Sequence, residues 1–152
     1  MTITSVKQLN QHTCSLACIE SLSIDKGNPI TQRDLIDKYP IECRKGEQYE
    51  GAVSHIYLVK ILIDLGFASK VVMGMGQAFL LAHQSNLEDG IFLNTTLASD
   101  GKTPEYHTWR LERFLPDGLA VVEPSQSCSY PYIQFPWGYL QHRGCIAAVC
   151  IP

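Results

Sequence analysis

The chain has 152 residues, of which 45% are hydrophobic and 18% are charged, so it can bury a real core and is not of the disordered class. Its net charge of −3 and pI near 5.9, without a basic stripe, argue against nucleic acid as a partner. No apolar run reaches the roughly 18 residues that a membrane-spanning helix needs.

We expect a single domain over residues 1–152, because the length is ordinary for one domain and the sequence has no internal repeat or dividing linker. The polar segment 1–11 lacks the apolar core of a signal peptide, which favours a soluble, cytoplasmic domain. Two alternatives stay open: the domain is one piece of a longer membrane protein, or it is exported by a route that leaves no such signal.

Six cysteines are present, at positions 14, 18, 43, 128, 145 and 150. Without a signal peptide, free thiols are expected in place of disulfides. The spacings from Cys14 to Cys18 and from Cys145 to Cys150 are looser than a CxxC pair, which argues against a zinc site. We therefore expect no metal and no cofactor.

Three helices are predicted in the first half of the chain, at residues 14–26, 31–39 and 54–65. Thr13 is a good N-cap for the first helix, and Gly27 is a natural stop. The third helix carries an apolar stripe at i, i+3, i+4 and i+7 spacing, formed by Leu58, Ile61, Leu62 and Leu65.

The second half changes to strand-like patterns, with predicted strands at residues 67–73, 90–95, 106–115, 119–123 and 145–151. A short helix is predicted at 77–84, and a turn at 116–118 joins two of the strands. Because helices come first and strands follow, the pattern indicates an α+β fold with an antiparallel sheet.

Cys14 is the first candidate for chemistry, because it stands at the start of the first predicted helix. The unpaired N–H groups and the positive end of the dipole at a helix N-terminus favour a thiolate, which is the reactive form of cysteine. The alternative is a small buried residue, which is the commoner role of a cysteine at this place.

His107 and Glu123 lie on the two predicted strands that flank the turn at 116–118. Their midpoint falls beside that turn, so in an antiparallel pair they should be cross-strand neighbours to within a residue or two. A carboxylate beside a histidine fixes its tautomer and supports its charged form, as a catalytic base requires. An ordinary charge pair on a solvated face is the alternative.

Acyl chemistry at a thiolate creates an oxyanion, which needs preorganised hydrogen-bond donors. Gln8 stands shortly before Cys14, so its side-chain amide and the Cys14 backbone N–H are candidates for this role. Gln11 could fill the same role on chemistry alone. The alternative is that a glutamine in this polar segment is simply exposed on the surface.

The segment from Gln8 to Cys18 reads QLNQHTCSLAC. It resembles the opening of peptidase family C39, the double-glycine leader peptidases, in which a Gln and five further residues precede Cys-Gly-x-Ala-Cys. The family's His is followed sixteen residues later by Asp-Pro, and here Glu123-Pro124 follows His107 at that spacing.

The resemblance extends over most of the chain, though thinly between its main points. Residues 51–72 are similar to the family's Gly-led helix, Leu-Gly turn and following strand, and residues 135–138 to its Phe…Trp-x-Gly element. The combination of Gln…Cys, His and acid-Pro is moderately specific, whereas each of these alone is not.

The resemblance implies a papain-like cysteine protease fold, with N-terminal helices packed on an antiparallel sheet. It implies a cysteine peptidase, a hydrolase with Cys14 as nucleophile, His107 as base, Glu123 as orienting acid and Gln8 as oxyanion donor. Its substrate would be a peptide or protein, cut after Gly-Gly in a leader peptide, and an ABC transporter encoded nearby would be a partner.

Three departures from the family pattern leave other functions open. Ser15 replaces a usual glycine, Glu123 replaces Asp, and residues 108–110 replace an apolar strand segment. A divergent protease, an effector-type deamidase or acyltransferase, and a silent peptide-binding module therefore remain alternatives. Asn94 is a further candidate for the orienting group, since papain-like enzymes often use Asn. The presence of Cys14 favours an enzyme, because silent family members usually lack this cysteine.

Overall fold

The computed structural model describes residues 3–68, 70–74, 76–85, 90–125 and 130–151. Within these residues the helices are Cys14–Asp25 (α1), Gln32–Lys38 (α2), His55–Asp64 (α3), Gln77–Ala82 (α4) and Trp137–His142 (α5). The strands are Lys70–Gly74 (β1), Ile91–Leu97 (β2), Pro104–Leu115 (β3), Gly118–Val122 (β4), Tyr132–Pro136 (β5) and Ile146–Ile151 (β6). In the described part of the chain, no helix has the length and apolar character needed to cross a membrane.

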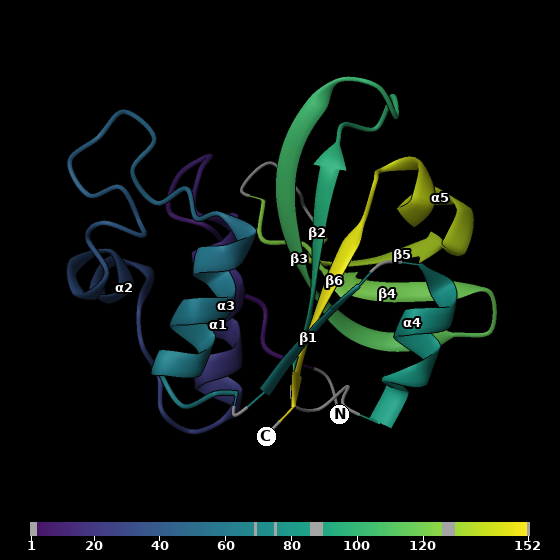
Figure 1. Cartoon of the computed structure of the whole chain (residues 1–152), viewed down its shortest axis with the longest axis horizontal. Coiled ribbons are helices and arrows are strands. Elements are labelled where there is room, and N and C mark those ends of the chain that lie inside the picture. The colour runs from purple at the N-terminus through teal and green to yellow at the C-terminus, as the bar shows by residue number, and fades with distance from the viewer. Residues whose placement is uncertain (1–2, 69, 75, 86–89, 126–129, 152) are drawn as a thin grey trace.

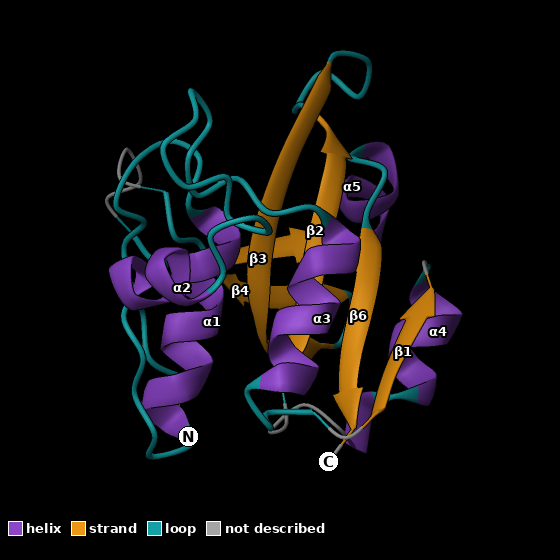
Figure 2. Ribbon diagram, turned by 60° about the vertical axis from the view of Figure 1, so that its left-hand side comes forward, coloured by secondary structure: helices purple, strands orange, loops and turns teal. Residues whose placement is uncertain are grey.

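The strands form one sheet in the order β1-β6-β2-β3-β4-β5, and every neighbouring pair is antiparallel. Helices α1, α2 and α3 lie on one side of this sheet, and α4 and α5 lie on the other (Figures 1 and 2). The predicted α+β class, with N-terminal helices packed on an antiparallel sheet, is therefore confirmed.

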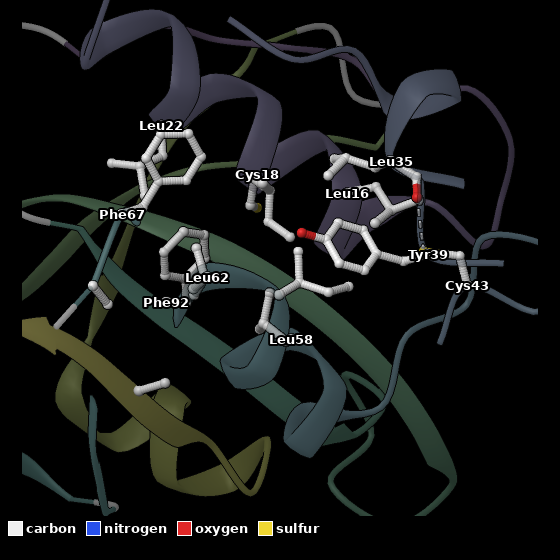
Figure 3. Close-up of a cluster of buried hydrophobic side chains, with 14 of the residues drawn as sticks. Leu16, Cys18, Leu22, Leu35, Tyr39, Cys43, Leu58, Leu62, Phe67 and Phe92 are labelled. Carbon is white, nitrogen blue, oxygen red and sulfur yellow. Dashed lines mark hydrogen bonds between the residues drawn. The ribbon is translucent and has the colours of Figure 1, made fainter. Parts of the chain in front are cut away.

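Each face of the sheet carries its own hydrophobic core, because side chains alternate between the two faces along a strand. Phe92 and Ala148 face α1–α3, whereas Leu93 and Ala147 face α4 and α5. Figure 3 shows the core on the α1–α3 side, where side chains of the three helices meet Phe92.

Two of the helix starts follow the capping rules. The hydroxyl of Thr31 accepts the Asp34 N–H at the start of α2, and the hydroxyl of Ser54 accepts the Tyr57 N–H at the start of α3. Thr13 does occupy the N-cap position of α1, but its side chain makes no capping bond. The expected N-cap position is therefore confirmed, but the capping bond is absent because the Thr13 hydroxyl bonds to the backbone of Asn10.

Polar contacts fix α1 on β3, the strand that carries His107. The guanidinium of Arg110, itself 1% exposed, donates to Ser21 at 2.8 Å and forms an ion pair with Asp25 at 2.5 Å. Nearer the start of the helix, Ser15 and Thr108 share a hydroxyl–hydroxyl hydrogen bond of 2.7 Å. The N-terminus of α1 is therefore held in a defined position beside β3.

The segment before the last strand contains β5 and α5, which the sequence patterns did not predict. Pro131 precedes β5 and Pro136 is its last residue, and a proline is tolerated only at strand ends and sheet edges. The strand is indeed at the edge of the sheet, paired only with β4 among the described strands. Its alternation of exposed and half-buried residues gives a weak strand signal.

Candidate active site

Cys14 is the first residue of α1 and is half-buried. It follows a tight turn in which the Asn10 carbonyl accepts the Thr13 N–H and hydroxyl, and the Asn10 side chain accepts the His12 N–H. This turn leads directly into α1 and places Cys14 at the helix N-terminus. There, free backbone N–H groups and the helix dipole favour negative charge.

His107 on β3 makes a side-chain hydrogen bond to Cys14. Its Nε2 is bound to Glu123, so Nδ1 is the ring nitrogen left to face the sulfur. Burial raises the pKa of Cys14, but the hydrogen bond and charge of His107, helped by the backbone N–H of Thr108, outweigh burial and lower it from its ordinary value. The thiolate is thus favoured by its surroundings.

Glu123 follows the end of β4 and binds the other side of the His107 ring, with Oε1 2.5 Å from Nε2. Its carboxylate also accepts the Trp109 indole N–H at 2.6 Å and the Ser125 backbone N–H at 2.9 Å. Burial raises the pKa of Glu123, but these partners, His107 foremost, outweigh burial and lower it. The carboxylate is therefore charged and held in one orientation.

The cross-strand contact expected between His107 and Glu123 is present. The β3–β4 pairing runs from Leu115↔Gly118 to Arg110↔Val122, with a register shift between Leu111 and Arg113. Continuing this register puts Trp109 opposite Glu123 and His107 on the diagonal, two residues along the same face. The glutamate side chain reaches both, which explains why it binds the indole and the imidazole together.

The glutamine expected to stabilise an oxyanion lies close to this region, but its amide is already engaged. Gln8 is 6% exposed, its backbone N–H donates to the Pro124 carbonyl at 2.9 Å, and its Nε2 donates to the Asn10 carbonyl at 2.7 Å. Its Oε1 is buried without a hydrogen-bond partner among the described atoms. Gln11 lies on the surface, with Nε2 3.4 Å from a ring nitrogen of His12.

Asn94 does not orient His107. Its Oδ1 accepts the Thr108 hydroxyl at 2.6 Å, and its Nδ2 lies 2.5 Å from Nδ1 of His55. His55 is half-buried against this asparagine. Both ends of the Asn94 amide are therefore bound to Thr108 and His55.

Thr108 is a site residue that the sequence patterns did not single out. Its backbone N–H and its hydroxyl both lie within hydrogen-bonding reach of the Cys14 sulfur. The only signal in the sequence was that residues 108–110 are more polar than the resemblance implied. Trp109 is 1% exposed and binds Glu123 through its indole N–H.

Cys14 should be the first of the six thiols to be alkylated. Burial raises the pKa of Cys43 and Cys145 to about 12, and burial followed by the charge of Cys14 holds the pKa of Cys18 well above its ordinary value. Cys128 lies outside the described residues, as does the side chain of Cys150. Limited treatment with iodoacetamide near neutral pH, read by mass spectrometry, checks this order; preferential labelling of Cys43 or Cys128 with Cys14 inert would contradict it.

Solved structures share this architecture over nearly the whole chain. The peptidase domain of Streptococcus ComA, a bifunctional ABC transporter involved in a quorum-sensing pathway, is 14% identical, with a TM-score of 0.67 over 99% of this chain and 98% of that chain. A C39-like peptidase from Bacillus anthracis is 10% identical, with a TM-score of 0.66 over 99% and 95%. A double-glycine-motif protease of an AMS/PCAT transporter, solved with its leader peptide, is 10% identical, with a TM-score of 0.54 over 99% and 91%.

No protein-family model matches this chain, and no curated protein sequence matches it either. At 10–14% identity the structural likeness concerns the fold, which is that of C39 peptidase domains. The expected papain-like fold is thereby confirmed.

The departures from the family pattern contact one another or their immediate neighbours. Ser15, which stands where a glycine is usual, bonds to Thr108, and Trp109 bonds to Glu123, which stands where an Asp is usual. Arg110 completes the set through its ion pair with Asp25. Each of residues 108–110 therefore has a hydrogen-bond partner for its side chain, although the buried Nε of Arg110 has none among the described atoms.

Proposed function

We propose that this chain is a cysteine peptidase that hydrolyses a peptide bond with Cys14, His107 and Glu123. The observation that carries the proposal is the continuous hydrogen-bonded chain from the Cys14 thiol through the His107 ring to the buried Glu123 carboxylate. A nucleophile at a helix N-terminus, a base within reach and a third group that orients the base are what covalent catalysis needs.

In the proposed reaction the Cys14 thiolate attacks the carbonyl carbon of the scissile peptide, and a C–S bond forms while the carbonyl oxygen becomes an oxyanion. The His107 imidazolium then gives its proton to the leaving nitrogen as the C–N bond breaks, which leaves a thioester. His107 next takes a proton from water, the resulting hydroxide equivalent attacks the thioester, and the acid product leaves with Cys14 restored as thiolate.

The roles of the remaining groups follow from the same scheme. Glu123 keeps the His107 ring in one tautomer and supports its positive charge. The Cys14 backbone N–H and the Gln8 amide would stabilise the oxyanion, which requires the Gln8 amide to turn from Asn10 toward the substrate. The likeness to a leader peptidase fold makes a Gly-Gly leader peptide the first substrate class to test, with an ABC transporter encoded nearby as the proposed partner.

Incubation with a synthetic peptide that contains a Gly-Gly site should give two products by mass spectrometry, with the bond broken after the second glycine. Prior alkylation of Cys14 should abolish the cleavage, and Cys14→Ala is the matched variant that shows the loss is specific to this thiol. A reactive Cys14 without cleavage of this peptide or of a varied peptide library would contradict the peptidase and favour the deamidase or acyltransferase alternative.

The pH dependence gives this cleavage test a second readout. Burial lowers the pKa of His107, but its bonds to Cys14 and Glu123 outweigh burial and raise it to about 9. The proton that the leaving nitrogen needs is therefore present at neutral pH and is lost as pH rises through about 9. Cleavage should fall there, while alkylation of Cys14, which needs only the thiolate, should continue; parallel losses of both would count against His107 as the acid.

A further inference from the structure

The hydroxyl of Thr108 contacts three groups that can each accept its single proton. Its Oγ1 lies 2.6 Å from Oδ1 of Asn94, 2.7 Å from Oγ of Ser15 and within hydrogen-bonding reach of the Cys14 sulfur. Thr108 is 2% exposed, so bulk water does not supply or remove hydrogen bonds there. Whichever acceptor takes this proton deprives the other two of a donor.

The orientation of the Asn94 amide determines which acceptor receives the Thr108 proton. Its Nδ2 lies 2.5 Å from Nδ1 of His55, and an amide nitrogen can only donate, so His55 must accept at Nδ1 and is neutral. Burial lowers the pKa of His55, which agrees with a neutral ring. With Nδ2 turned to His55, Oδ1 faces Thr108, and this oxygen can only accept.

The Ser15 hydroxyl donates in the direction that this arrangement requires. Because Thr108 gives its one proton to Asn94, the 2.7 Å contact between Ser15 and Thr108 must have Ser15 as the donor. The bonds then run in one direction, from Ser15 through Thr108 to Asn94, and the Thr108 proton points away from Cys14.

We propose that Asn94 is a positioning residue that withholds the Thr108 hydroxyl from Cys14 and so limits formation of the thiolate. The inference rests on the proposed function in taking Cys14 as the nucleophile, but not on peptide hydrolysis. As the thiolate forms, it either goes without this donor or the Thr108–Asn94 bond breaks first. The Thr108 backbone N–H and His107 then remain as the donors that support the negative sulfur.

Replacing Asn94 with leucine removes the competing acceptor at nearly constant size, so the Thr108 hydroxyl becomes free to donate to the thiolate. The midpoint of the pH profile for iodoacetamide alkylation of Cys14 should move down by about 1 pH unit, as expected for one hydrogen bond to a charged group. His107 and Cys18, the titratable groups that face Cys14, are unchanged in this variant. A midpoint that stays or rises overturns the inference.

The Thr108→Val background is the control that separates this path from a general disturbance of the site. Valine keeps the shape of threonine but has no hydroxyl, so Asn94→Leu should move the midpoint by less than about 0.3 pH unit in that background. An equal downward move with and without the Thr108 hydroxyl overturns the inference, because the effect would then reach Cys14 by another route.

Two further results keep this test separate from the test of function. A Cys14 that fails to react in the unaltered protein overturns the proposed function and this inference together, whereas a reactive Cys14 with an unmoved midpoint overturns only the inference. Thermal unfolding followed by circular dichroism verifies that each variant folds. Should Asn94→Leu not fold, Asn94→Ala in both backgrounds gives the same comparison, with the same downward move expected.

Discussion

Replacing Glu123 with alanine should lower peptide turnover by about 10³–10⁴-fold and slow the alkylation of Cys14. The loss of turnover follows because Glu123 orients the His107 ring, with 2.5 Å between Oε1 and Nε2. Alkylation slows for a different reason. Without the carboxylate the imidazolium is less stable, so it supports less thiolate at neutral pH. Rates of cleavage and of alkylation, both measured across pH, check the two parts separately.

Glu123→Ala should also reduce stability, and a matched variant separates that effect. The Trp109 indole, on a side chain 1% exposed, loses its acceptor, which costs about 1–3 kcal/mol of unfolding free energy. Glu123→Gln keeps an oxygen for the indole but removes the charge, so it should fold nearly normally and still alkylate slowly. Glu123→Asp should be milder than alanine in every assay.

The outcome for this variant also tests the assignment of the third catalytic group. An unchanged alkylation rate in Glu123→Ala across the pH range would show that the carboxylate does not support the ion pair. Asn94 could not take over without a rearrangement, because its amide is bound to Thr108 and His55. A silent, peptide-binding role for the site would then become the better explanation.

The elements that the sequence predicted are those whose signals are local. The helix starts near Thr31 and Ser54, the apolar stripe of α3 and the turn at 116–118 depend on residues within a few positions of one another. The edge strand β5, which is preceded by one proline and ends in another, was missed because its pairing with β4 is a tertiary contact. The missing capping bond at Thr13 has a local cause, since the turn at Asn10, three residues earlier, takes the hydroxyl.

The same distinction between local signals and tertiary contacts applies to the residues of the site. His107 and Glu123 could be paired from the sequence because one turn joins their strands and fixes their distance from it. Ser15 and Thr108 could not, since they are 93 positions apart and meet only when α1 packs on β3. For the same reason, Asn94 was considered as a partner of His107. Its actual partner, His55, is the first residue of α3, and only the folded chain brings the start of α3 beside β2.

Replacing Gln8 with alanine should lower turnover by about 10²–10³-fold while the alkylation rate of Cys14 stays nearly unchanged. An oxyanion donor acts only once negative charge builds on the substrate oxygen, so it contributes nothing to the free thiolate. Substrate binding should also stay nearly unchanged, because the ground-state carbonyl needs the donor far less. Single-turnover cleavage, compared with alkylation of the same variant, separates this behaviour from that of Glu123→Ala.

The contacts of Gln8 in the free protein make this prediction demanding. Its Nε2 donates to the Asn10 carbonyl and its Oε1 is buried without a partner among the described atoms, so the amide is poorly satisfied as it stands. A substrate oxyanion would give the amide nitrogen a better acceptor than a neutral carbonyl. Gln11→Ala is the matched control and should cleave normally. Should Gln8→Ala cleave as fast as the unaltered protein while Gln11→Ala is slow, the oxyanion role passes to Gln11; if both cleave normally, the backbone N–H of Cys14 carries it alone.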